Sequence, residues 1–318
     1  MVSFISVFAT AILPIVGVGG VGYLLGRWRS IDTDALNTVI VYILAPALVF
    51  YSLATTTLAQ STLFRASVAV IIYHLLAMGV AAGIGRLFNK SKTAVAALML
   101  VTAFPNSGNY GIPVSNFAFG STGRATAVIY LSVQGIILYT LGVYIASRGG
   151  TKSRLAGIKR VFTVPLVYAV IAALIARVLQ IVPSTDTTAM ATIKLVGDAA
   201  IPLMLLVVGI RLARTDIGST LSAVGLGVGL KMVIAPVIGL GTAVMIGFDD
   251  PIVARTFVLE SAMPSAVTPM ILVAEFGSGD VAGVPIAEFV SAAVFVSTMI
   301  SIPVLTLVIV ILKSGAVI

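Results

Sequence analysis

The segment "AFPNSGNYGIP", residues 103–113, interrupts an apolar stretch that is long enough to cross a lipid bilayer. It contains two prolines, two asparagines and two glycines among eleven residues. Proline removes a backbone donor and moves the preceding residue out of the helical region, so we expect a helix to break at Phe104 and Pro105. Broken backbone is tolerated at membrane depth only where it is buried in protein or lines a cavity. The segment therefore predicts a polar site inside the bilayer.

The composition of the chain indicates an all-α membrane protein. Of its 318 residues, 59% are hydrophobic and only 9% are charged, whereas a soluble domain has roughly 25% charged residues. The apolar runs are long and lack the alternation typical of strands, which favours spanning helices.

The composition also argues against several functions. The chain has no cysteine, which excludes disulfides and thiolate chemistry, and a single histidine, His74, cannot form a histidine metal cluster. We find no nucleophile–base set and no phosphate-binding loop, so we do not expect an enzyme or an ATP-driven pump. The net charge of +8 is scattered through short loops, so nucleic acid is not an expected partner.

Ten segments are long enough to span a hydrocarbon core of about 30 Å, which needs roughly 20 apolar residues per helix. The predicted spans are residues 5–25, 35–54, 66–86, 93–118, 125–146, 161–182, 190–211, 219–247, 252–276 and 283–311. Lysine and arginine are more frequent in the loops after odd-numbered spans than in the other loops. The positive-inside rule then predicts a multi-pass protein of the cell membrane with both termini outside.

Three prolines recur at matching places in the two halves of the chain. The pairs are Pro14 and Pro165, Pro46 and Pro202, and Pro105 and Pro264. We expect a first five-helix repeat at residues 1–146, a basic cytoplasmic loop at 147–160, and a second repeat at 161–318. Because five is an odd number, the second repeat is inverted. Inverted repeats with interrupted helices in corresponding positions are typical of secondary transporters and mark the binding site.

The breaks in spans 4 and 9 predict the substrate site. They free backbone groups, and the N-terminus of each following half-helix carries partial positive charge that suits an anion. The candidate substrate-binding residues lie beside one of the two breaks: Pro105, Asn106, Ser107, Asn109, Pro264, Ser265 and Thr268. The alternative is a pair of kinked helices that only pack against each other.

Three segments resemble the corresponding parts of the auxin efflux carrier family, which includes plant auxin exporters and prokaryotic permeases. They are "FPNSGNYGIPV" (104–114), "PLMLLVVGIRL" (202–212) and "MPSAVTPMILVAEFG" (263–277). The resemblance covers nearly the whole chain. It implies a scaffold and a transport domain, crossing of the broken helices 4 and 9 at the substrate site, and a small organic anion as substrate. Many family members have asparagine where this chain has Thr268, so the substrate contacts differ there.

Ionisable residues at membrane depth are costly and are candidates for function. Glu260 lies one helical turn before the second break and could bind Na⁺ or H⁺ as a coupling ion; no cofactor is expected. Lys231 could balance Asp198 or Glu260 in a buried ion pair, or act in coupling. Asp198 could equally pair with Lys194 on its own helix. His74 is either a proton carrier or a hydrogen-bonded packing residue.

These observations predict a secondary transporter of a small organic anion, auxin-like or another carboxylate. Elevator-type alternating access would move the crossover of helices 4 and 9 against the scaffold. The expected partners are the anion and the lipid bilayer, with a homodimer through the scaffold as an open alternative. Other functions to distinguish are a sodium- or proton-coupled symporter of the bile-acid type and a non-transporting receptor or channel. A channel needs a continuous polar pore, whereas the polar residues here gather at one depth.

Overall fold

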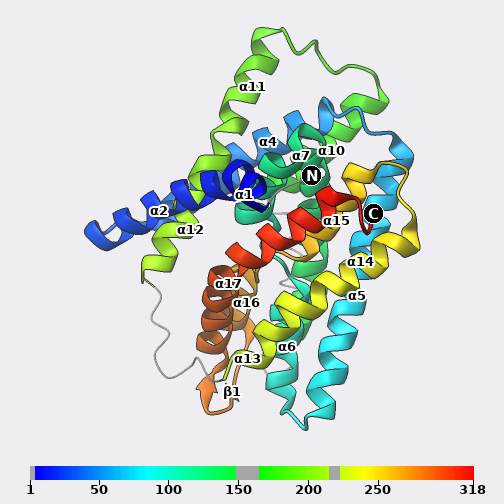
Figure 1. Ribbon diagram of the computed structural model, residues 1–318. Coiled ribbons are helices and arrows are strands. Elements are labelled where there is room, and N and C mark those ends of the chain that lie inside the picture. The colour runs from blue at the N-terminus through cyan, green and yellow to red at the C-terminus, as the bar shows by residue number, and fades with distance from the viewer. Residues whose placement is uncertain (1–3, 148–164, 215–222) are drawn as a thin grey trace.

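The computed structural model describes residues 4–147, 165–214 and 223–318. The predicted basic loop at 147–160 lies outside these residues except for Ser147. The described chain is almost entirely helical (Figure 1), apart from irregular connections and a short hairpin of β1 (Asp280–Val281) and β2 (Val284–Pro285).

Several helices are joined end to end by short π-helical segments, which are labelled η. The first half contains α1 (Phe4–Val7), η1 (Phe8–Ile12), α2 (Leu13–Trp28), α3 (Thr33–Val39), η2 (Ile40–Leu44), α4 (Ala45–Ala54), α5 (Gln60–Leu87), α6 (Lys92–Ala103), η3 (Ser107–Gly111), α7 (Ile112–Ile137), η4 (Leu138–Gly142) and α8 (Val143–Ala146). The second half contains α10 (Pro165–Val178), α11 (Thr188–Asp198), α12 (Ala200–Arg214), α13 (Gly225–Gly229), η7 (Leu230–Ile234), α14 (Ala235–Ile246), α15 (Pro251–Ser261), α16 (Thr268–Phe276) and α17 (Ile286–Ser314).

Seven continuous helices in the described part of the chain are long and apolar enough to span a membrane. They are Phe4–Trp28, Thr33–Ala54, Gln60–Leu87, Ser107–Ala146, Thr188–Arg214, Gly225–Ile246 and Ile286–Ser314. The sequence predicted ten, and the difference has physical causes. Predicted span 9 is divided into α15 and α16, and predicted span 4 is divided into α6, η3 and the start of α7. The described part of predicted span 6 is the short helix α10.

The helical stretch Ser107–Ala146 covers the second part of predicted span 93–118 and all of the next span, 125–146. Its 40 residues would measure about 60 Å as a straight helix, because each residue adds 1.5 Å. That length exceeds a hydrocarbon core of about 30 Å. Gly120 divides the stretch, since its φ of 66° and ψ of −150° are not helical. Glycine can adopt this positive φ without a steric penalty.

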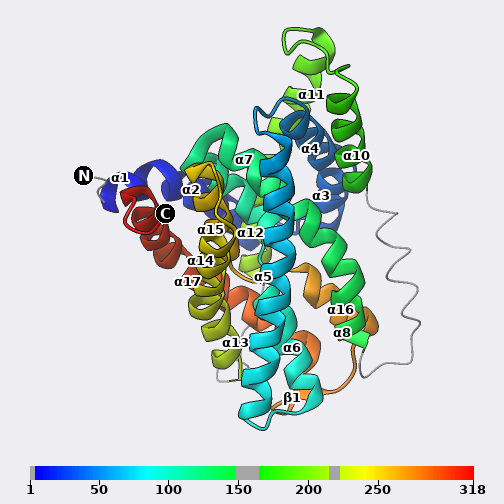
Figure 2. The ribbon, with the colours of Figure 1, turned by 90° about the vertical axis from the view of Figure 1, so that its right-hand side faces the viewer.

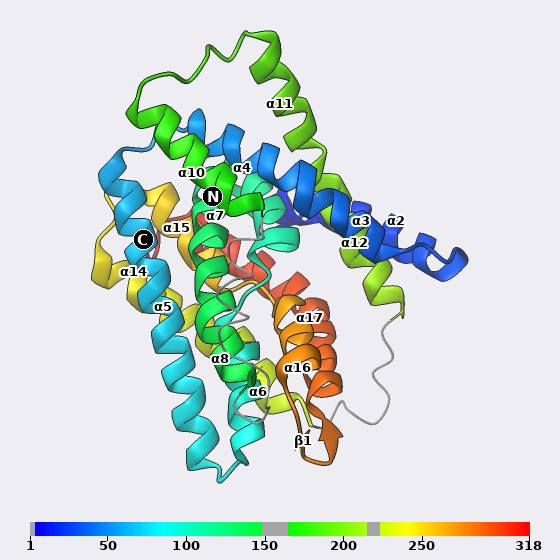
Figure 3. The same cartoon turned by 180° about the vertical axis from the view of Figure 1, so that it is seen from behind.

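The contacts between helices divide most of them into two groups, whose elements can be followed in Figures 1, 2 and 3. In the first group, α2 and α3 pack against α12, and α4 packs against α10 and α11. The second group contains α5 to α8 and α13 to α17. The two groups meet where α7 contacts α4 and where η3 contacts α12.

Small residues allow α2 and α12 to approach closely. A Cβ atom at Gly22 would overlap the backbone of Leu206, and one at Gly209 would overlap the carbonyl oxygen of Gly19. Close approach of this kind is how membrane helices gain packing energy, since lipid provides no hydrophobic drive between them. The α2–α12 pair is therefore the closely packed part of the first group.

Candidate functional site

The two broken segments pair with each other through their backbones. The Asn106 N–H donates to the Pro264 carbonyl oxygen at 2.7 Å, and the Ala266 N–H donates to the Phe104 carbonyl oxygen at 2.9 Å. These bonds form an antiparallel bridge between Pro105 and Ser265. Each break thus supplies hydrogen-bond partners to the other, which is how irregular backbone can persist at membrane depth.

Side chains hold this bridge from both sides. Gln134 of α7 donates to the Pro105 carbonyl oxygen at 2.8 Å and accepts from the Ser107 hydroxyl at 3.1 Å. In the second broken segment, the Ser265 N–H donates to the Ser297 hydroxyl at 3.1 Å. Gln134 and Ser297 were not among the site residues predicted from the sequence. The signal available for Gln134 was a glutamine amide in an otherwise apolar span.

Two cavities lie beside the bridge, between the two helix groups. Their volumes are about 630 Å³ and about 220 Å³. The residues that line both are Asn37, Asn106, Asn109, Arg211, Val267 and Ile271. The larger cavity extends to the exposed Asp34 and to Arg214 at the end of α12. It therefore connects the bridge with one end of the bundle.

The predicted substrate-binding residues divide into two sets. Five line the smaller cavity: Pro105, Asn106, Ser107, Asn109 and Thr268. Pro264 and Ser265 line neither cavity, and the buried Ser265 hydroxyl instead donates to the Val101 carbonyl oxygen at 2.8 Å. Asn37 and Arg211 were not predicted. Arg211 contributed only to the count of basic residues near the loops. Its position at the end of the predicted span 190–211 did not indicate that its side chain faces a cavity.

Asn106 and Val267 line both cavities, and each immediately precedes a helix. Asn106 immediately precedes η3, which continues into α7, and Val267 immediately precedes α16. The positive ends of two helix dipoles are therefore directed at the cavity wall. Amide groups of Asn106 and Asn109 add donors and acceptors at the same place.

Lys231 lies at the negative ends of the two preceding half-helices. Its buried ammonium donates to the carbonyl oxygens of Thr102 at 3.2 Å and Ser261 at 3.3 Å, and to the Tyr73 hydroxyl at 3.4 Å. Thr102 is in the last turn of α6 and Ser261 is the last residue of α15. A cation is favourable at helix C-termini. Within the described residues, no ion pair joins Lys231 to Glu260 or Asp198.

The Glu260 carboxyl group is fully buried on α15. Its Oε1 accepts from the Ser115 hydroxyl at 2.6 Å, whereas its Oε2 has no hydrogen-bond partner among the described residues. A Cβ atom at Gly111 would overlap this carboxyl group, so glycine is needed for the close approach. A buried carboxylate is strongly unfavourable unless it is paired, protonated or bound to a cation.

His74 is buried in an aromatic cluster. Its Nδ1 lies 2.7 Å from the Val70 carbonyl oxygen, and its ring lies 5.2 Å from that of Tyr73 and 5.4 Å from that of Phe104. Its Nε2 has no partner among the described residues. His74, Lys231 and Glu260 line neither cavity.

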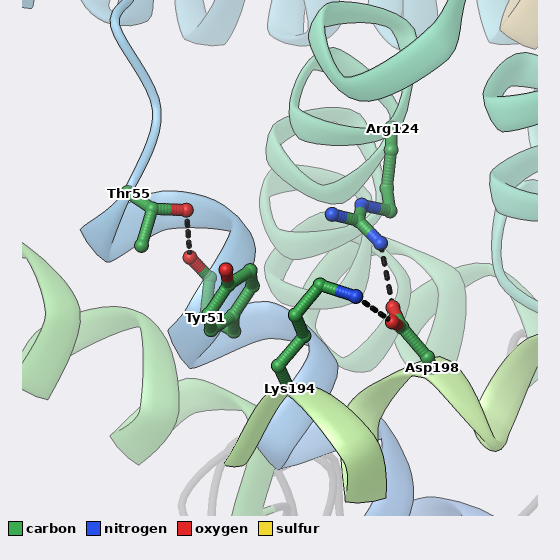
Figure 4. Close-up of polar contacts among 5 residues, drawn as sticks. All are labelled: Tyr51, Thr55, Arg124, Lys194 and Asp198. Atoms are coloured by element: carbon green, nitrogen blue, oxygen red, sulfur yellow. Dashed lines mark hydrogen bonds and ion pairs between the residues drawn. The ribbon is translucent and has the colours of Figure 1, made fainter. Parts of the chain in front are cut away.

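Asp198 is the last residue of α11 (Figure 4), and among the described residues it forms no ion pair with Lys231. Its carboxylate accepts from Arg124 Nη1 at 2.8 Å and from Lys194 Nζ at 2.6 Å, and its side chain is 37% exposed. Of the two partners predicted for Asp198, Lys231 and Lys194, the structure has the ion pair with Lys194, which lies on the same helix. Arg124 belongs to α7, so the pair with Asp198 also connects the two helix groups.

A bundle of apolar helices with a polar cavity at two paired helix breaks defines a multi-pass membrane protein with an internal polar site. The family model described as membrane transport protein matches residues 7–161 and again residues 157–309. The chain therefore belongs to this auxin efflux carrier-type family of membrane transporters, and the two matches divide it into two repeats. The resemblance stated from the sequence is confirmed.

Two proteins similar to this chain are named as transporters. An uncharacterized transporter from Methanothermobacter thermautotrophicus is 27% identical over 294 residues, which cover 92% of this chain and 93% of the relative. A "putative malonate transporter" from Rhizobium meliloti is 26% identical over 318 residues, which cover 96% of each chain. The similarity thus extends over nearly the full length of both relatives.

Proposed function

We propose that this membrane transporter carries a small organic anion as a secondary transporter, and that the substrate binds in the cavities beside the paired breaks. The observation that carries the proposal is the opposite polarity of the two sides of the bridge. On the cavity side lie two helix N-termini, the amides of Asn106 and Asn109, and Arg211. All of these favour an anion. The negative helix ends are turned to Lys231 instead.

The relative named as a malonate transporter supports a carboxylate as the substrate class. The smaller cavity, at about 220 Å³, is below the roughly 300–1,000 Å³ of pockets that hold drug-sized ligands. A small carboxylate fits this volume better than a bulky auxin-like molecule does.

The helix groups suggest how transport proceeds. The first group is the scaffold and the second, with the crossover of predicted helices 4 and 9, is the transport domain of an elevator in a ten-helix inverted-repeat fold. The larger cavity opens near Arg214, on the side that the positive-inside rule assigns to the cytoplasm. We therefore propose that the conformation described is inward-open, and the same rule predicts both termini outside.

We also propose that Glu260 carries a coupling proton. Its Oε2 lacks a hydrogen-bond partner in the described part of the chain, so protonation is the simplest way to keep this carboxyl group buried. A coupling Na⁺ would use carbonyl oxygens of the unwound segments. Two carbonyl oxygens at the ends of the broken helices already accept from Lys231, which favours H⁺ over Na⁺.

The test is uptake of radiolabelled carboxylates into proteoliposomes, with pH and Na⁺ gradients applied separately. Asn109→Leu keeps a similar volume and removes the amide, so uptake affinity should fall about ten- to hundredfold, because a hydrogen bond to a charged group contributes about 1.5–3 kcal/mol. The matched control is Asn116→Leu, an equally half-buried asparagine of α7 that lines neither cavity. Equal uptake by both variants and the wild type would place the substrate elsewhere.

A further inference from the structure

An apolar groove of about 320 Å³ lies beside the larger polar cavity. The two spaces share four lining residues, which form the wall between them: Val208, Leu212, Phe295 and Thr298. The first two belong to α12 and the last two to α17, and the groove also touches α2 and Tyr110 of η3. The groove therefore lies between the two helix groups, next to the first broken segment.

The groove opens toward the surroundings of the bundle and suits a hydrocarbon chain. Tyr23 of α2 and Met299 of α17 line it and are 43% and 40% exposed. Both lie in helices that are long and apolar enough to span a membrane, so the opening faces lipid. The Thr298 hydroxyl already donates to the Val294 carbonyl oxygen at 2.7 Å. An apolar cavity is not filled by water, and an empty one loses packing contacts.

A basic residue lies at one end of the groove. Arg27 follows Tyr23 by one turn on the same face of α2 and is exposed. Its guanidinium group forms no hydrogen bond or ion pair with another described residue. The neighbouring Trp28 is 73% exposed, and tryptophan is enriched where a membrane meets water. Arg27 is therefore placed to meet a lipid headgroup.

The length of the groove along α2 matches one leaflet of a bilayer. Ile15 is the first residue of α2 that lines the groove, and Arg27 comes twelve positions later. At 1.5 Å per residue, the two are about 18 Å apart along the helix. One leaflet contributes half of a hydrocarbon core of about 30 Å. An acyl chain that fills the groove thus brings the phosphate of its lipid to Arg27.

We propose that this groove binds a membrane phospholipid, with one acyl chain between the two helix groups and the phosphate at Arg27. A guanidinium group binds phosphate through charge-assisted hydrogen bonds, often two in parallel. The second acyl chain of the lipid stays in the bilayer. The positive-inside rule assigns Arg27 to the cytoplasmic side, so the lipid comes from the cytoplasmic leaflet.

A bound lipid also affects the balance between conformations. Its acyl chain contacts α2 and α12 on one side and α17 on the other. Movement of the groups against each other changes the groove, so the lipid binds the described arrangement more tightly than the alternatives and stabilises it. This consequence rests on the proposed function, because it assumes that the groups move, whereas the lipid site does not depend on it.

The test uses the full-length protein in phosphatidylcholine vesicles with a few per cent of a photoreactive phosphatidylglycerol, which carries a diazirine at the end of one acyl chain. After illumination, mass spectrometry locates the labelled residues. Ile15 and Leu205 line the groove and are buried, so only a chain inside the groove reaches them, and we expect both to be labelled. Labelling of the exposed Val237 on α14 measures lipid that only surrounds the protein.

Two glycines of α2 provide a matched pair of variants. Gly20 lines the groove, and a Cβ atom there would have open space around it. Gly20→Leu therefore occupies the space of the acyl chain and should reduce labelling of Ile15 and Leu205 at least about tenfold relative to Val237. Gly17→Leu is the control, because Gly17 also has open space at its Cβ position but does not line the groove.

Arg27→Gln tests the phosphate contact and should reduce labelling of the groove about fivefold. Arg86→Gln, which removes a charge from the exposed end of α5, should leave it unchanged. In a Thr38→Cys background, the cysteine in the larger cavity should react with a soluble maleimide up to about fivefold more slowly when Arg27→Gln is added. Unfolding temperature is measured for every variant.

The outcomes separate the lipid site from its consequence and from the proposed function. Wild-type protein without label on Ile15 and Leu205, or equal labelling of the two glycine variants, refutes the acyl-chain site. Equal labelling of Arg27→Gln and Arg86→Gln refutes the phosphate contact and with it the phospholipid. Equal cysteine reaction rates refute only the stabilising effect. None of the labels requires anion transport, so a failure of uptake overturns the proposed function and leaves the lipid site standing.

Discussion

Glu260 offers the sharpest test of how this transporter is energised. Glu260→Gln preserves the shape of the side chain, and the amide oxygen can still accept from the Ser115 hydroxyl, which lies 2.6 Å from Oε1 in the wild type. The amide nitrogen replaces Oε2, which has no hydrogen-bond partner in the described residues. The substitution therefore changes only the protonation chemistry if the wild-type carboxyl group is neutral.

The two possible protonation states predict different stabilities. If Glu260 is protonated, the variant exchanges one buried O–H for a buried NH₂ group, and the free energy of unfolding should fall by about 1 kcal/mol. If Glu260 is ionised and balances the buried Lys231, the variant leaves an uncompensated buried cation and should lose about 3–5 kcal/mol. We expect the smaller loss, because no ion pair joins the two side chains in the described chain.

The assay measures unfolding in detergent and uptake under an imposed pH gradient for three proteins. They are Glu260→Gln, Lys231→Met and the double variant. We expect Glu260→Gln to remain folded and bind substrate while its uptake no longer responds to the pH gradient. The reasoning is refuted if Glu260→Gln loses 3–5 kcal/mol and the double variant recovers that stability, since Glu260 would then be a structural counter-charge. A wild-type response of Glu260→Gln to the pH gradient would also refute it.

Two further predictions concern topology and the outer side of the bundle. A reporter fused after Ile318 should be extracellular, and one inserted at Gly150 should be cytoplasmic; finding both on one side contradicts the predicted ten-span topology. Arg124→Gln removes the ion pair between the helix groups and should weaken the inward-open state by up to about 1 kcal/mol, or about fivefold in population. Because the chain has no cysteine, the labelling rate of Thr38→Cys in the larger cavity reports this shift. Lys194→Gln is the control, since it removes only the pair within α11, and an equal effect of both variants would argue against a lock between the groups.

The sequence determined the features that depend on neighbouring residues. Hydropathy over windows of about twenty residues is enough to establish a helical membrane protein, because the bilayer requires long apolar helices. The breaks at Pro105 and Pro264 follow from local steric effects of proline, and the structure has α6 and α15 ending just before them. The candidate residues Asn106, Ser107 and Asn109 follow from their position beside the first break.

Only the tertiary structure decided which distant groups meet. The hydrogen bond of Asn106 to Pro264, the hydrogen bond of Lys231 to Thr102, and the shared cavity of Arg211 and Asn106 each join residues more than 100 positions apart. Asp198 shows the same limit, because its partner on its own helix was foreseen and its partner Arg124 on α7 was not. A residue's own neighbours set its helix and depth, but its rotation toward a cavity depends on how whole helices pack. Close contacts such as that of Gly209 with Gly19 fix this packing.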